Sequence, residues 1–340
     1  MNTTKYRLKN IWLLACLLLV ILMILVGGFT RLTDSGLSIT EWKPITGIIP
    51  PLNGIGWDNE FSKYRDSPEY TQHNFNMSLA DFKFIYWTEF IHRLLGRITG
   101  LVFLLPMMFL YLKGNLGKIY PYLLILALLA FQGFMGWYTV RSGLINNPYV
   151  SHFRLATHLI TAFIIYSLIF WQFLSNYSRD YLSVGKINLS KARALGTWAI
   201  ILLFCQVYLG GLVAGLGAGQ VYNSFPLMGD SFIPQDLNIT NSVLKNLSNP
   251  VLVQFLHRIN AYILVIAAVA LSISLFSTGK TRLRLTAVGI IISLSLQLLA
   301  GIFTLIRHVP IELALLHQIG AVLLLSSLIC SKYFTKNVVY

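Results

Sequence analysis

The sequence predicts an all-α integral membrane protein whose eight transmembrane helices form two tandem four-helix bundles in the same orientation. The 340 residues are 56% hydrophobic and 11% charged, with a mean hydropathy of +0.67, which is far too apolar for an ordinary soluble domain. Eight apolar runs are long enough to cross a bilayer, which takes about 20 residues of helix. The two halves of the chain also resemble each other, so we expect four spans in each.

The predicted spans are separated by one very long connection and several short ones. The spans cover residues 11–29, 89–112, 119–140, 153–175, 195–215, 251–276, 284–305 and 311–331. Residues 30–88, between the first two spans, form a connection much longer than usual, which we interpret as a lid or a binding surface. Near its end, Ser78 and Asp81 have the spacing of a capping box, so the second span is expected to begin as a helix outside the membrane. The counterpart loop, 216–250, is shorter and nearly free of charge.

The distribution of Lys and Arg predicts the orientation, because these residues collect in cytoplasmic loops. The basic excess lies in segments 1–10, 113–118, 176–194, 277–285 and 332–340, so both termini are expected to be cytoplasmic. The net charge of +14 is spread over short loops without a dense run, which disfavours nucleic acid as a partner. No cleavage site follows the first span, and we expect a multi-pass protein of the bacterial cytoplasmic (inner) membrane.

An internal repeat relates the two halves. Residues 89–105 align with 254–270 at an offset of 165, 131–144 with 296–309, and 158–169 with 317–329. Four spans return the chain to its starting side, so the halves are expected to share one orientation about an axis along the membrane normal. We therefore divide the chain into an N-terminal half, 1–190, and a C-terminal half, 191–340.

Four histidines, His92, His158, His257 and His317, lie near the start of the even-numbered spans, toward the outer face. An ionisable residue inside a membrane is costly and suggests a functional site. A single histidine would more often be a packing or hydrogen-bonding residue, but one pair per half at similar depth favours ligation of haem or a metal. Two imidazoles can bind a haem iron from opposite faces, whereas zinc or copper normally needs further ligands. We expect His92 to pair with His158, and His257 with His317, with packing and proton relay as alternatives.

Three arginines follow the histidines closely, at Arg93, Arg97 and Arg258. They could pair with the anionic propionates of a haem, or extend to lipid head groups, and the residues alone favour neither reading.

The two halves differ three residues before the first histidine of each. Glu89 precedes His92 on the same helical face, whereas Gln254 precedes His257. A carboxylate beside a haem can move protons or stabilise positive charge, and an amide cannot. We therefore assign chemistry to the N-terminal half and electron storage or transfer to the C-terminal half. The alternative is that Glu89 caps the helix or pairs with Arg93.

The ordered series GGFTRLTDSGLSITEWKPITGIIPPL, DFKFIYWTEFIHRLLGR, QGFMGWYTVRSGL, SHFRLATHL, QFLHRINAY and LLHQIGA resembles the haem A synthases of cytochrome oxidase assembly over nearly the whole chain. The resemblance implies an oxidoreductase that uses oxygen to convert the C8 methyl of haem O to a formyl group, giving haem A. It implies that His92 and His158 lie at the substrate haem, that His257 and His317 hold a haem b cofactor, and that Glu89 is catalytic.

Residues 30–88 contain no cysteine, and Cys16, Cys205 and Cys330 fall inside predicted spans. The chain therefore resembles the cysteine-free branch of proteobacterial and mitochondrial type, which lacks a thiol route for electrons. A haem with two histidine ligands offers oxygen no site, so either His92 or His158 dissociates in turnover or the pair is a resting state. The sequence leaves open the electron donor, delivery of haem O by a haem O synthase, and a homo-oligomeric state.

Two other classes of protein remain as alternatives. A diheme b-type cytochrome acting only in electron transfer would use the four histidines identically but would need neither Glu89 nor the long loop. A transporter built on a parallel repeat would require broken helices and polar residues at mid-membrane, which are scarce in this sequence.

Overall fold

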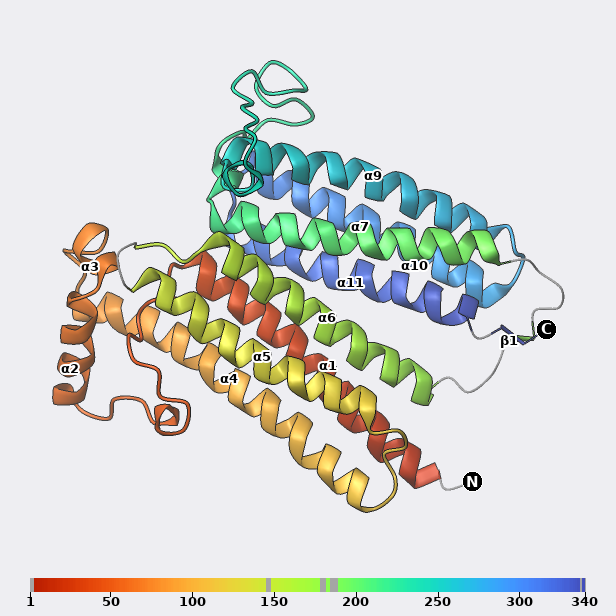
Figure 1. Ribbon diagram of the computed structural model, residues 1–340, viewed down its shortest axis with the longest axis horizontal. Coiled ribbons are helices and arrows are strands. Elements are labelled where there is room, and N and C mark those ends of the chain that lie inside the picture. The colour runs from red at the N-terminus through yellow and green to blue at the C-terminus, as the bar shows by residue number, and fades with distance from the viewer. Residues whose placement is uncertain (1–2, 145–147, 178–181, 184–188, 337, 340) are drawn as a thin grey trace.

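The computed structural model describes residues 3–144, 148–177, 182–183, 189–336 and 338–339, so parts of the predicted cytoplasmic segments 1–10, 176–194 and 332–340 lie outside the described residues. Within those ranges eight helices are long and apolar enough to cross a membrane, which confirms the predicted number of spans. They are α1 (Thr3–Leu32), α4 (Leu79–Leu112), α5 (Tyr120–Gly143), α6 (His152–Tyr177), α7 (Ser190–Gly215), α9 (Pro250–Phe276), α10 (Thr281–Ile306) and α11 (Ile311–Lys336), shown in Figure 1.

Helix α4 begins well before the apolar run, as the capping-box spacing predicts. The Ser78 side chain accepts a hydrogen bond from the Asp81 backbone N–H at 3.2 Å, and the Asp81 carboxylate accepts one from the Ser78 N–H at 3.3 Å. The helix contains 34 residues. Since about 20 residues cross the hydrocarbon, roughly the first 14 residues of α4 lie outside it.

The long connection is folded rather than irregular. It contains η1 (Thr46–Ile48), α2 (Gly54–Arg65) and α3 (Pro68–Gln72). We call residues 54–72, which comprise α2 and α3, the helical cap. The cap packs on the extension of α4, with the Phe61 and Phe82 ring centroids 4.9 Å apart and those of Trp57 and Tyr86 5.1 Å apart. The apolar side chains of the cap therefore have their own core outside the membrane-spanning region.

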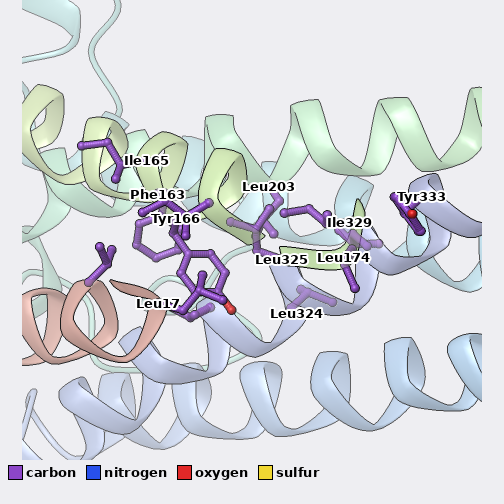
Figure 2. Packing of buried hydrophobic residues seen from close by; sticks show 14 of the residues in the cluster. Leu17, Phe163, Ile165, Tyr166, Leu174, Leu203, Leu324, Leu325, Ile329 and Tyr333 are labelled. Carbon is purple, nitrogen blue, oxygen red and sulfur yellow. The ribbon is translucent and has the colours of Figure 1, made fainter. Parts of the chain in front are cut away.

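The spans form two rings of four helices. In the first half, α1 and α5 each contact both α4 and α6, and in the second half α9 and α11 each contact α7 and α10. The halves meet through α1, α6, α7 and α11, an arrangement compatible with two tandem bundles. Figure 2 shows this junction, where Leu17, Phe163, Tyr166, Leu203 and Leu325 pack together.

Two repeat-equivalent glycines permit close approach of the two halves. Gly28 of α1 faces Gln318 of α11, whose side-chain amide donates to the Ile24 carbonyl at 3.0 Å. Gly211 of α7 faces the Ala156 backbone of α6, where an added Cβ would lie 2.7 Å from Cα. A side chain at Gly211 would push α6 and α7 apart, whereas one at Gly28 would displace the Gln318 side chain and break its hydrogen bond to Ile24.

The two ends of the molecule differ. Helix α1 begins and α11 ends at the same end, close to the paired two-residue strands β1 (Leu182–Ser183) and β2 (Val338–Val339). The strands were not predicted, because two residues carry no periodic pattern. The opposite end, which we call the loop-bearing end, carries the helical cap and a second loop with η2 (Ala218–Gln220) and α8 (Val243–Asn246) (Figure 1).

The cap contains a buried carboxyl, Glu69, that makes its stability depend on pH. Glu69 accepts a hydrogen bond from the Tyr64 hydroxyl at 2.9 Å, and burial raises its pKa to about 7, with smaller contributions from Asp34 and Glu89 that raise it and from Arg31 that lowers it. A carboxyl whose pKa is raised by folding stabilises the folded state fully below its ordinary pKa, and this contribution is lost as the pH rises through about 7.

We therefore expect hydrogen-exchange protection of α2 and α3, corrected for the intrinsic pH dependence of exchange, to fall between about pH 5 and about pH 8. Glu69→Gln should remove most of that fall, while Asp66→Asn, an exposed change in the same cap, should leave it intact. An unchanged pH profile in Glu69→Gln would show that another group is responsible.

Candidate functional site

The structure brings the four histidines together in the two predicted pairs. His92 is on α4, His158 on α6, His257 on α9 and His317 on α11, all in the part of the helix nearer the loop-bearing end. His92 lies near His158, and His257 lies near His317. All four side chains are partly buried. Each half thus presents two neighbouring imidazoles from two different helices.

A glycine of an adjacent helix lies beside each imidazole. A Cβ added at these glycines would lie within 4 Å of the ring: 3.2 Å for Gly27 and His92, 3.6 Å for Gly136 and His158, 3.3 Å for Gly210 and His257, and 2.7 Å for Gly301 and His317. Gly27 and Gly210 are equivalent in the repeat, as are Gly136 and Gly301. Analysis of polar residues missed this feature, although the repeat alignment places these glycines in register.

The C-terminal pair also has amide partners that the sequence analysis missed. The Gln206 side-chain nitrogen lies 3.0 Å from His257 Nε2, and its oxygen accepts a hydrogen bond from Asn260 at 2.6 Å. His317 Nδ1 lies 3.1 Å from the backbone oxygen of Gln297. Gln206 lies four residues before Gly210. In the N-terminal half, the residue four positions before the equivalent Gly27 is Met23. The surroundings of the two pairs are therefore chemically different.

Glu89 is 2% exposed and has hydrogen bonds at both carboxylate oxygens. Oε2 accepts from the Ser38 hydroxyl at 2.7 Å and the Ile39 N–H at 2.8 Å, and Oε1 accepts from Arg93 at 2.6 and 3.0 Å. The Arg93 ion pair considered from the sequence is thus formed. At the equivalent position, Gln254 donates to the Tyr222 carbonyl at 2.9 Å. Glu89 therefore anchors the loop between α1 and α4 as a hydrogen-bond acceptor. Gln254 anchors the loop between α7 and α9 as a donor.

The three predicted arginines donate to loop carbonyls. Arg93 donates to Ile39 and Glu41, Arg97 to Lys43 and Pro44, and Arg258 to Tyr222, Ser224 and Leu227, all at 2.8–3.2 Å. Arg97 Nη1 and Arg258 Nε are buried and have no hydrogen-bond partner among the described residues. Each arginine thus fixes a loop, and two of them keep a donor for an anionic group.

These residues fit a haem. Each half offers two imidazoles with glycine backbone beside the rings, and Nδ1 of His158 and of His257 are buried without a hydrogen-bond partner in the described chain. The unpaired donors of Arg97 and Arg258 suit anionic propionates. In the described ranges no group of three or more His, Cys, Asp or Glu residues could hold a metal ion. The two imidazoles of each site would hold a haem iron, which histidine commonly ligates.

The repeat-equivalent glycines provide a matched test of how closely the rings are packed. Gly301→Ala should displace His317, because its Cβ would lie 2.7 Å from the ring, whereas Gly136→Ala leaves an ordinary 3.6 Å contact with His158. Overpacking of this kind costs about 1–3 kcal/mol. We expect Gly301→Ala to lower the haem content of the purified protein, measured by its absorption spectrum, and Gly136→Ala to preserve it. Equal haem content in both variants would contradict the close packing at Gly301.

Comparison with known proteins identifies the family. The family model of the cytochrome oxidase assembly proteins matches residues 10–329. A haem A synthase of Rickettsia bellii (strain OSU 85-389) is 49% identical over 333 residues, covering 97% of this chain and 99% of the relative. Those of Rickettsia felis and Rickettsia canadensis are 46% and 47% identical over 328 residues, with 96% of this chain and 97% of each relative covered. The chain therefore belongs to the family of cytochrome oxidase assembly proteins.

Proposed function

We propose that the protein is a haem A synthase, an oxidoreductase that uses oxygen to convert the C8 methyl of haem O to the formyl group of haem A. One observation carries this proposal: two equivalent histidine pairs are present, and among the described residues only the N-terminal pair has a buried carboxylate, Glu89, one turn from a histidine. Relatives that match almost the full chain are named haem A synthase, which supports the same activity. The methyl carbon would be hydroxylated twice, and loss of water would then give the aldehyde.

We assign the substrate haem to His92 and His158, and a resident haem b to His257 and His317. When bound, haem b supplies one-electron redox chemistry. Gln206 and Gln297 interact with the C-terminal imidazoles, which favours a permanent ligand pair in that half. Release of His92 or His158 would be needed to admit oxygen in the other half. Arg93, Arg97 and Arg258 would hold the loops, with Arg97 and Arg258 retaining donors for propionates.

The hydrogen bonds of Glu89 limit how it can act. Its carboxylate accepts four hydrogen bonds, from Ser38, Ile39 and Arg93. Proton transfer through Glu89 therefore requires one of these donors to move away. Without such movement, the carboxylate contributes a fixed negative charge that stabilises positive charge developing near His92.

We further propose a bacterial inner-membrane location with both termini in the cytoplasm and the haem sites toward the outer face. Helix α1 begins and α11 ends at the end opposite the helical cap, which supports a common side for the termini. The lack of cysteine in residues 30–88 supports membership of the cysteine-free branch, with electrons arriving by another route. We place a haem O synthase in the same membrane as the source of substrate.

Extraction of haem from the purified protein tests the activity directly. After expression with a source of haem O, we expect haem O, haem A or a hydroxylated intermediate in addition to haem b, separated by chromatography and identified by mass. Recovery of haem b alone would point to a diheme electron-transfer cytochrome instead.

Glu89→Gln should stall conversion of haem O, because it removes the negative charge beside His92. It should preserve the haem b spectrum, because it leaves the C-terminal pair of histidines unchanged. The change also disturbs the anchoring of the loop, so Ser38→Ala is the matched control: it removes one of the same hydrogen bonds, at 2.7 Å, and keeps the carboxylate. We expect Ser38→Ala to retain most of the conversion. Full activity in Glu89→Gln, or equal losses in both variants, would remove Glu89 from the chemistry.

A further inference from the structure

The loop between α1 and the helical cap exposes a group of large apolar side chains. Ile45 is 81% exposed, Leu52 82%, Ile49 64% and Ile48 51%. The four side chains lie within eight residues, in and around η1 and Pro50-Pro51. A water-facing loop of a soluble protein rarely carries such a concentration of exposed apolar area, which marks an interaction surface.

The tip of this loop lies beside the middle of α4 rather than beyond the end of the bundle (Figure 1). The Arg97 guanidinium donates to the carbonyls of Lys43 and Pro44 at 2.9 Å each, and Gly47 approaches the same side chain. Counting about 20 residues back from Leu112, the hydrocarbon begins near His92. Arg97 is five residues deeper, or about 7.5 Å at 1.5 Å per residue. A helical side chain leans toward the N-terminal end of its helix, so the Arg97 guanidinium and the carbonyls that it binds lie above the Arg97 Cα. The loop thus reaches the level where the hydrocarbon begins.

The backbone that leads into residues 44–52 is held against α4. Irregular backbone exposed to lipid does not occur within the hydrocarbon, so a loop at this level must keep its backbone against protein or in the interface. Arg93 donates to the carbonyls of Ile39 and Glu41, at 2.8 and 3.0 Å, just above those bound by Arg97. Two arginines of α4 therefore satisfy four carbonyls along one side of the loop and leave its apolar side chains facing outward.

In the second half, the loop between α7 and α9 contacts its helix at the equivalent level. Tyr262 of α9 stands 165 residues after Arg97 and is its repeat equivalent. The Phe232 ring, from the loop between α7 and α9, stacks on Tyr262 with centroids 6.0 Å apart. Phe232 and its neighbour Ile233 are 47% and 59% exposed. Both loops thus contact their helix at equivalent positions and carry exposed apolar side chains there.

We propose that residues 44–52 lie in the membrane interface at the loop-bearing end and rest the side chains of Ile45, Ile48, Ile49 and Leu52 on the acyl chains of that leaflet. The apolar surface of α4 that the spans present to lipid continues directly beside the loop, through the exposed side chains Ile98, Leu101 and Leu105. Immediately before the loop, Lys43 pairs with Glu41, which also binds Lys63 at 3.0 Å, so charged groups lie at the level of the head groups. This insertion is independent of the proposed enzymatic activity.

A depth measurement on the full-length protein in phospholipid vesicles tests the insertion. With Cys16, Cys205 and Cys330 replaced by Ala, a nitroxide label is placed at Ile48→Cys, and the control label at Asn59→Cys on the exposed side of α2. A label among acyl chains collides more often with oxygen than with a water-soluble nickel chelate. We expect oxygen to dominate at residue 48 and the nickel chelate at residue 59. Dominance of the nickel chelate at both positions would overturn the proposal.

A second measurement needs no substitution. A photoactivated diazirine dissolved in the vesicle lipid should modify the wild-type peptide that contains residues 44–52, and should spare Asp58, Asn59 and Ser62 on the exposed side of α2. If the loop peptide is as unmodified as α2, the segment lies in water or under another protein, and the proposal fails even if the labelled variants are misfolded.

Discussion

A polar group that leaves water must find a partner, and this requirement organises the loop-bearing half of the molecule. Glu89 meets it with Ser38, Ile39 and Arg93, and Gln254 meets it with the Tyr222 carbonyl. Arg97 and Arg258 do the same for loop backbone. The side chains beside the histidines therefore also hold the loops at the loop-bearing end. A change in one of these side chains affects both the surroundings of the histidines and the position of a loop.

The two halves share the arrangement of their histidines and glycines, but the side chains around the histidines differ in polarity. A glycine accompanies every imidazole in both halves, so the shape of the two sites is preserved. The surroundings are not: Glu89 corresponds to Gln254, and Met23 to Gln206. The two halves therefore offer the same arrangement of histidines and glycines in surroundings that differ in charge and in hydrogen-bonding groups.

The sequence predicted what depends on local pattern. The eight spans and the capping box at Ser78 follow from hydropathy and spacing. The glycine contacts and the amides Gln206 and Gln297 were missed, because whether a residue faces a neighbouring helix depends on rotation about the helix axis. The core of the helical cap, where Phe61 meets Phe82, joins segments without a shared pattern. The hydrogen bonds from Arg93 and Arg97 to loop carbonyls were also missed, because composition alone does not encode the path of the loop along α4.

The continuity of α4 has a mechanical consequence. One uninterrupted helix runs from Leu79, where the helical cap packs, through His92 to Leu112. Pro106 removes one bond of the helical ladder farther along, where Trp12 donates to the freed Val102 carbonyl. The part between Leu79 and His92 contains no proline, so a force that tilts the cap also tilts the imidazole of His92. A displacement of the helical cap would therefore change the position of His92 without any change within the bundle itself.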